Sequence, residues 1–219
     1  MSTDQTNTQE TNSRRVVNSV RAALVRADTA LRSFRDAGYH LGDAVAEAVD
    51  NSIQAGAKQV HIDWIGEDVQ EGRSAKKVGF EIKSLAIGDD GSGVPPDLLP
   101  HVLTVGFSTR YGSRDGIGRF GVGFKLASLS QARRLEIYTM PAFLRAAEQK
   151  NVDGPETWSF SEPNTEKRVF MAYLDLDEIE KGDQKYYEIQ EVQGFPEEFS
   201  HLMEGAESGT LIVWRKTDR

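Results

Sequence analysis

LGDAVAEAVDNSIQAGA, residues 41–57, is the stretch that most constrains the fold of this chain. Good helix formers run from Leu41 to Ala55 and Gly56 ends the run, so we predict a helix over 41–55. Glu47 and Asn51 lie four residues apart and therefore project from one face of that helix. A carboxylate and an amide are therefore available to the same site. The helix surface that packs consists of small or apolar residues: Ala44, Val45, Ala48, Val49 and Ser52.

Two glycine-containing segments follow along the chain. IGDDGSGVPP, residues 87–96, places Asp89 at the end of an apolar strand, and Gly91 and Gly93 permit close approach of the backbone to a flat ligand. A carboxylate at this position can accept a hydrogen bond from the adenine amino group. By itself, the D-x-G-x-G pattern is also common in ordinary turns.

DGIGRFGVGFKLAS, residues 115–128, contains glycines at 116, 118, 121 and 123 followed by a predicted helix. Bare backbone N–H groups and a helix N-terminus suit phosphate, and Lys125 adds a positive charge. A flexible connection would explain the glycines equally well. The run is neither a Walker P-loop nor a Rossmann fingerprint, because the spacing and flanking elements differ.

The composition is that of one soluble domain. The chain has 219 residues, 38% hydrophobic and 27% charged, a net charge of −8 and no cysteine. No apolar run approaches the about 20 residues of a membrane span, and the polar opening is unlike a signal peptide. We therefore expect a cytoplasmic protein with no membrane partner, built as a disordered tail over 1–13 and one domain over 14–219.

The remaining patterns predict a sheet with helices on one face. We expect helices over 16–36, 96–105 and 123–130, and strands over 59–65, 78–89, 133–140, 157–160, 167–176, 186–192 and 209–215. Residues 14–35 carry six arginines against one aspartate. This basic stretch can contact nucleic acid or an acidic partner, but a solvated helix face explains it with fewer assumptions.

The residue types suit ATP chemistry. The Asn51 amide oxygen is a hard ligand for Mg²⁺, which takes few protein ligands. Glu47, one turn earlier, can act as general base toward a water that attacks the terminal phosphate. Taken alone, such an i, i+4 pair is usually just a solvated helix pair, so the prediction depends on the two glycine segments.

In this order, the motifs resemble the ATP-binding domain of the GHKL group, which comprises gyrase B subunits, large heat-shock chaperones, histidine kinases and MutL. The sequence is most similar to MORC-like and MutL-like members. The order is a helix with acid and asparagine, D-x-G-x-G, a glycine lid, and Ser208-Gly209-Thr210 on a late strand. The resemblance implies an α+β, two-layer α/β sandwich (Bergerat fold) with a mixed, mostly antiparallel sheet and a left-handed βαβ crossover.

The resemblance also implies roles for individual residues. Glu47 matches the water-activating base, Asn51 the magnesium ligand, and Asp89 the acceptor of the adenine amino group, with Thr210 beside the adenine. The other expected nucleotide-binding residues shape the pocket or form the lid over the phosphates: Gly91, Gly93, Ser108, Thr109, Gly118, Arg119, Phe120, Gly121, Val122, Gly123 and Lys125. Gln54 and Arg110 depart from the aspartate and lysine common in relatives, and neither change removes an essential group.

These features lead us to expect a Mg²⁺-dependent ATPase in which lid closure and an ATP-dependent homodimer drive a larger machine. Residues 1–36 are placed to join that dimer, and protein or DNA partners would act through a longer protein of which this chain is an N-terminal part. The alternative is a nucleotide-gated interaction module with little or no turnover. Histidine-kinase phosphotransfer would need an upstream phosphoacceptor histidine, where the sequence has an arginine-rich stretch instead.

Overall fold

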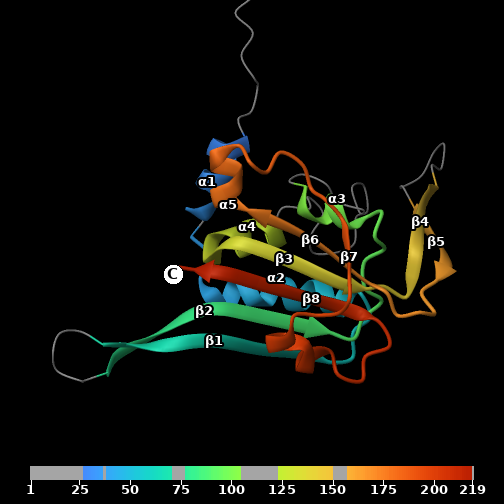
Figure 1. Ribbon diagram of the computed structural model, residues 1–219, viewed down its shortest axis with the longest axis horizontal. Coiled ribbons are helices and arrows are strands. Elements are labelled where there is room, and N and C mark those ends of the chain that lie inside the picture. The colour runs from blue at the N-terminus through green and yellow to red at the C-terminus, as the bar shows by residue number, and fades with distance from the viewer. Residues whose placement is uncertain (1–26, 37, 71–76, 105–122, 150–156, 219) are drawn as a thin grey trace, which may run out of the picture.

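A six-stranded antiparallel sheet forms the centre of the molecule (Figure 1). The computed structural model describes residues 27–36, 38–70, 77–104, 123–149 and 157–218. The strand order is β1-β2-β8-β3-β6-β7, and each neighbouring pair is antiparallel. The strands span Val60–Gln70 (β1), Lys77–Asp89 (β2), Gly209–Thr217 (β8), Ala132–Met140 (β3), Val169–Asp175 (β6) and Gln190–Val192 (β7).

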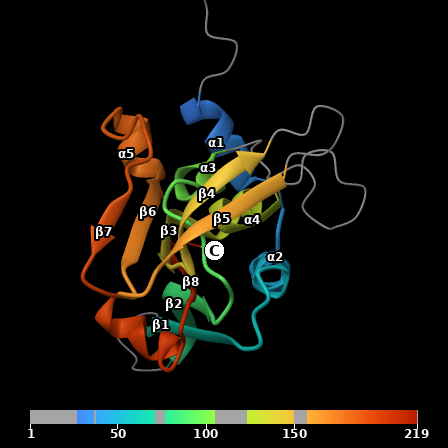
Figure 2. The same ribbon diagram turned by 90° about the vertical axis from the view of Figure 1, so that its right-hand side faces the viewer.

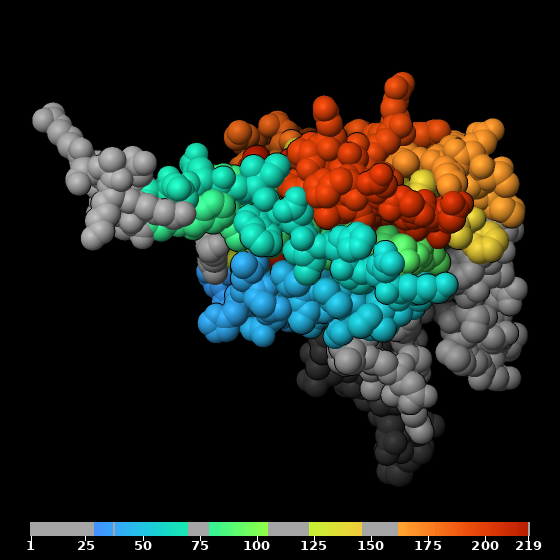
Figure 3. Space-filling view, turned by 90° about the horizontal axis from the view of Figure 1, so that it is seen from below, coloured from blue at the N-terminus to red at the C-terminus, as the bar shows by residue number. Residues whose placement is uncertain are grey.

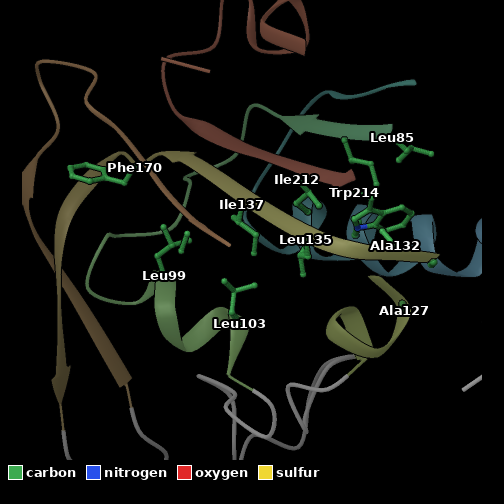
Figure 4. Packing of buried hydrophobic residues seen from close by; sticks show 14 residues of the cluster. Leu85, Leu99, Leu103, Ala127, Ala132, Leu135, Ile137, Phe170, Ile212 and Trp214 are labelled. Atoms are coloured by element: carbon green, nitrogen blue, oxygen red, sulfur yellow. The ribbon is translucent and has the colours of Figure 1, made fainter. Parts of the chain in front are cut away.

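Four α-helices gather on one face of this sheet. They are α1 (Ala27–Arg35), α2 (Leu41–Gln54), α3 (Leu99–Leu103) and α4 (Gly123–Gln131). Fully buried alanines at positions 44, 48 and 127 let α2 and α4 approach closely, and the core continues through the side chains shown in Figure 4, including Leu135, Ile137 and Trp214. The predicted two-layer α/β sandwich with a mostly antiparallel sheet is therefore confirmed.

The other face of the sheet is covered by a shorter segment. The 3₁₀ helix η1 (Glu197–Met203) packs Phe199, Leu202 and Met203 against it. Figure 2 shows α2 and η1 on opposite sides of β2 and β8. The sequence prediction contained no element at η1, although Phe199, Leu202 and Met203 have the i, i+3, i+4 spacing of a helix.

Two further elements were absent from the sequence prediction, a strand over 143–149 and a short helix over 176–181, whereas the strand predicted over 157–160 is the first part of β5. β4 (Phe143–Gln149) pairs with β5 (Thr157–Pro163) in a separate two-stranded sheet. The short helix α5 (Leu176–Lys181) begins after Asp175, whose side chain accepts hydrogen bonds from the N–H groups of Asp177 and Glu178. This cap ends β6 at Asp175, so the predicted strand over 167–176 is one residue too long at its end.

The first hairpin is longer than predicted. β1 continues through the mostly polar residues 66–70 because β2 remains beside it as a hydrogen-bonding partner, and Lys83 forms ion pairs with both Glu67 and Glu81. β7 contains only the last three residues of the strand predicted over 186–192. The predicted helix over 16–36 is described from Ala27 onward, and the predicted tail 1–13 lies outside the described residues.

The chain crosses the sheet between β2 and β3. Both strands are antiparallel to β8, which lies between them, so they run parallel to each other and are joined through α3 and α4. The left-handed sense of this crossover stays a prediction. No helix in the described part of the chain is long and apolar enough to cross a bilayer.

Candidate functional site

The Asp89 carboxylate forms the most constrained part of the site. It is 5% exposed at the end of β2. Its Oδ2 accepts a hydrogen bond from Ser52 Oγ at 2.9 Å, and its Oδ1 accepts one from the Gly91 N–H at 2.9 Å. The Thr210 backbone supplies a further hydrogen bond. α2, the loop after β2 and β8 thus all converge on one carboxylate.

The electrostatics of Asp89 reflect this enclosure. Burial raises the pKa of the Asp89 carboxyl above its usual value, and the hydrogen bonds from Gly91, Ser52 and Thr210 offset part of that rise. The three bonds stabilise the carboxylate as an acceptor. A ligand N–H that reached Asp89 would add one more donor to the same charged group.

Hydrogen bonds at both ends fix the loop after Asp89. The Ser92 N–H donates to the Ala55 carbonyl at 3.0 Å, and the Val94 N–H donates to Thr139 Oγ1 at 2.8 Å. Gly93 has a φ of +67°, and a Cβ on it would lie 2.7 Å from the Pro141 Cα. Only glycine fits this position. The D-x-G-x-G segment is therefore a rigid edge of the site.

Thr210 lies directly opposite Asp89 in the β2–β8 register and opposite Thr139 in the β3–β8 register. Residues that face each other in an antiparallel pair share one face of the sheet. Thr210 is 8% exposed. Asp89 and Thr210 therefore lie next to each other on the face that α2 covers.

Glu47 lies against the start of α4. A Cβ on Gly123, the first residue of that helix, would be 2.6 Å from Glu47 Oε2. No side chain fits there unless the carboxylate moves. Burial raises the pKa of the half-buried Glu47, and the nearby charge of Asp50 raises it further. The structure thus brings together a base candidate and the last glycine of the glycine-rich run, which are far apart in the sequence.

Asn51 lies one turn after Glu47 on α2 and is exposed to solvent. Its amide can therefore meet a ligand. Among the described residues, no three His, Cys, Asp or Glu side chains come together as a metal site. A Mg²⁺ ion that used Asn51 would draw its other ligands from water and phosphate, which is the usual pattern for this ion.

Lys125, in the first turn of α4, is 5% exposed. Burial lowers the pKa of its ammonium group to about 8, because removal from water disfavours the charged form. An anion beside it would restore that charge. The other predicted lid residues, Ser108, Thr109 and Gly118 to Val122, lie outside the described residues, as does Arg110.

Sequence reasoning missed two side chains of this site. Ser52 was assigned only to the packing surface of α2, and Thr139 was treated as part of a strand; their hydroxyls hold Asp89 and the loop after it. The signal for Ser52 was its i+4 spacing from Ala48 on the buried stripe, where a hydroxyl needs a partner. Thr139 had no local signal.

A separate cavity of about 410 Å³ opens near the ends of β1 and β2. Lys58, His61, Leu202 and residues 204–208 contribute to its lining, and Asp89 is the one predicted site residue among them. The His61 ring bonds to the Leu202 carbonyl, so this cavity belongs to the η1 side of the sheet. It is distinct from the α2 side, where Ser52 holds the Asp89 side chain.

A family model for histidine kinase-, DNA gyrase B- and HSP90-like ATPases matches residues 39–210, which include α2, the Asp89 loop, α4 and Thr210. The chain belongs to this ATPase family. The resemblance to the GHKL group expected from the motifs is therefore confirmed, and membership implies that the domain binds ATP.

Relatives in this family include MutL- and MORC-type proteins. The DNA mismatch repair protein MutL of Thermus thermophilus is 32% identical over 101 residues, which cover 45% of this chain and 16% of MutL. Protein MICRORCHIDIA 6 of Arabidopsis thaliana is 37% identical over 89 residues, 39% of this chain and 12% of that protein. ATPase morc-1 of Caenorhabditis elegans is 30% identical over 102 residues, 46% and 10% respectively. The matched region is thus a small part of each relative.

Proposed function

We propose that this GHKL-type domain binds ATP with Mg²⁺ and hydrolyses it to ADP and phosphate. The observation that carries the proposal is the position of Glu47, whose carboxylate lies against Gly123 at the start of α4. A base at the N-terminus of a helix that follows a glycine-rich run is well placed beside a terminal phosphate. ATP binding follows from the family; hydrolysis by this chain is the proposed step.

Adenine would lie against the Asp89 end of the site. The Asp89 carboxylate accepts a hydrogen bond from the adenine amino group, and Gly91 and Gly93 put no side chain on the loop edge at their positions. Thr210 contacts the base from β8. This assignment is supported by the burial of Asp89 and by the three hydrogen bonds that orient it.

The phosphates would extend toward the N-terminus of α4. Lys125 supplies positive charge there, and the backbone of Gly118 to Gly123, with the side chains of Ser108 and Thr109, completes the lid in this proposal. A buried lysine with a lowered pKa interacts with phosphate in a medium where charge is poorly screened. Its attraction to an anion is correspondingly larger than that of an exposed lysine.

Asn51 is the proposed protein ligand for Mg²⁺. The ion would neutralise phosphate charge and make the terminal phosphorus more electrophilic. Glu47 accepts the proton of the attacking water. Since burial raises the pKa of Glu47, its basic form is depleted as the pH falls toward that pKa, and turnover should fall with it at acidic pH.

Single-turnover hydrolysis with excess protein tests this function. Wild type and Glu47→Ala are compared with labelled ATP and Mg²⁺ at concentrations where both bind the nucleotide. We expect turnover to fall by about 100-fold or more in the variant with ATP binding retained. Binding without turnover in the wild type would reject hydrolysis by this chain and favour the nucleotide-gated interaction module.

We further propose that ATP drives lid closure and homodimer formation, and that this cycle operates a larger machine with protein or DNA partners. The support is the similarity to MutL, a mismatch repair protein, and to MORC ATPases. Light scattering with a non-hydrolysable ATP analogue tests the dimer. A mass that does not change on addition of the analogue would contradict it.

A further inference from the structure

β1 is an edge strand with unusual features. It is 11 residues long and, among the described residues, pairs with β2 alone. The β1–β2 ladder has two irregularities, and both insert the extra residue into β2, at Val78 and Lys83. β1 itself therefore runs without a bulge. It presents a regular row of backbone groups, which is what a second strand needs for pairing.

β1 exposes large apolar side chains on both of its faces. Ile62 and Trp64, which are 42% and 51% exposed, lie on the face that carries α2, and Ile65 and Val69 lie on the other. Neither lysine nor proline, the residues that commonly protect an edge, occurs in β1. Figure 3 shows β1 in teal along the surface beside the blue α2.

Charge protects this edge only weakly. On the η1 face of β1, Asp63 forms an ion pair with His201 at 3.0 Å and Glu67 forms one with Lys83 at 3.1 Å. Each carboxylate therefore already has a positive or protonatable partner within its own chain. The repulsion that two acidic edges would otherwise exert on each other is reduced.

One backbone group on the outer edge has a local partner. The Trp64 N–H donates to Asp63 Oδ1 at 2.8 Å, so it points away from β2. In an antiparallel strand, the N–H and C=O of one residue point to the same side. Trp64 thus offers a donor and an acceptor to a further strand, and Asp63 competes for the donor.

We propose that β1 pairs with β1 of a second copy of this chain, antiparallel, with the two-fold axis at Trp64. Side-chain alternation requires the axis to pass through a residue, because facing residues must share one face of the sheet. An axis at Asp63 sets Asp63 opposite its own copy, and an axis at Ile65 sets Asp63 opposite Glu67. An axis at Trp64 instead sets His61 opposite Glu67 and Asp63 opposite Ile65.

The same register matches the apolar residues. Trp64 faces its copy, and the two residues exchange a pair of backbone hydrogen bonds. Ile62 faces Gly66 of the second copy, where the Phe80 ring lies close to the position a Gly66 Cβ would take. The sheets of the two copies then form one continuous sheet. This contact needs no nucleotide, so it is separate from the ATP-dependent dimer proposed above.

Disulfide trapping tests the register, because the chain contains no cysteine. In Trp64→Cys, the two introduced residues lie about 5.5 Å apart between Cα atoms, within the range of a disulfide. In the control Ile62→Cys, the two copies are offset by four residues, or about 13 Å, and cannot join. We expect a covalent dimer from Trp64→Cys at a rate far above that of Ile62→Cys. Equal rates, or a faster Ile62→Cys, would overturn the register.

Sedimentation without nucleotide tests the association itself. Asp63→Ala removes the competitor for the Trp64 N–H and should strengthen the dimer by about fivefold or more. Trp64→Glu should abolish it, while Tyr186→Glu, at an 82% exposed position next to β7, should leave it unchanged. The proposal would be overturned if wild type and Asp63→Ala both stayed monomeric at high concentration. The exposed edge of β1 would then be a candidate site for a strand of a different protein.

Discussion

At the scale of single residues, Asp89 depends on a neighbour that has no chemical role of its own. The Ser52 hydroxyl donates to Asp89 Oδ2 at 2.9 Å, and its oxygen lies 3.2 Å from the Ala48 carbonyl oxygen within α2. The helix thereby fixes the orientation of a carboxylate on a strand. Substituting Ser52 leaves that carboxylate buried with one donor fewer.

We predict that Ser52→Ala weakens ATP binding about five- to tenfold, because a lost hydrogen bond to a buried carboxylate is worth about 1 to 1.5 kcal/mol. Isothermal titration calorimetry measures the affinity. Ser200→Ala is the control, since Ser200 is exposed and bonds within η1 to the Glu197 carbonyl. Equal affinities for the two variants would show that Ser52 does not position Asp89 for the nucleotide.

Lys125 provides a test based on pH. Its ammonium group has a pKa lowered to about 8, so the free protein loses this charge as the pH rises through that value. ATP affinity should therefore fall between about pH 7 and 9. Lys125→Arg keeps its charge over this range and should show a flatter profile. Identical profiles for wild type and variant would remove Lys125 from phosphate binding.

At the scale of elements, the site depends on the contact between α2 and α4. α2 spans Leu41–Gln54, one residue shorter than predicted, and Gly56 follows it with a φ of +79°. Its start and length follow from local propensity. Its distance from α4 follows instead from the small buried residues of both helices, which bring Glu47 to Gly123.

We predict that Gly123→Ala lowers ATPase activity without lowering the stability of the fold. The new Cβ would displace the Glu47 carboxylate, so single-turnover hydrolysis should fall at least tenfold, about 1.4 kcal/mol in the barrier. Alanine also favours a helix over glycine, so the melting temperature should not fall.

Gly42→Ala is the matched control for this experiment, because a Cβ at Gly42 in α2 meets no atom within 4 Å. It should retain full turnover. If Gly123→Ala hydrolysed ATP as fast as Gly42→Ala, the position of Glu47 beside α4 would be irrelevant to the chemistry.

At the scale of the whole molecule, Arg35 connects segments from both ends of the described chain. It is 7% exposed on α1 and donates to the Leu129 carbonyl in α4 at 3.1 Å. Its guanidinium also contacts both carboxylate oxygens of Asp218, at 2.5 and 2.6 Å, just after β8. α1 is thereby joined to the helix layer and to the end of the central strand.

We predict that Arg35→Met lowers the free energy of unfolding by about 2 kcal/mol, because the buried Leu129 carbonyl loses a donor and Asp218 loses the Nη2 group that contacts both of its oxygens. Urea denaturation measures this loss. Arg145→Met should cost less than about 0.5 kcal/mol, since the Arg145–Glu162 pair is exposed. Similar losses for both variants would show that Arg35 does not stabilise the fold in this way.

The sequence by itself determined α2, the pairing of Glu47 with Asn51 on one of its faces, the glycine at the tight turn after Asp89, and the family. Those features follow from helix period, backbone freedom and motif order, which are properties of short segments. The tertiary structure alone decided that Ser52 and Thr139 hold the Asp89 loop, that Glu47 lies against Gly123, and that β8 lies between β2 and β3. These contacts join segments that are distant in the chain, and only packing of the complete sheet and helix layer brings them within bonding distance.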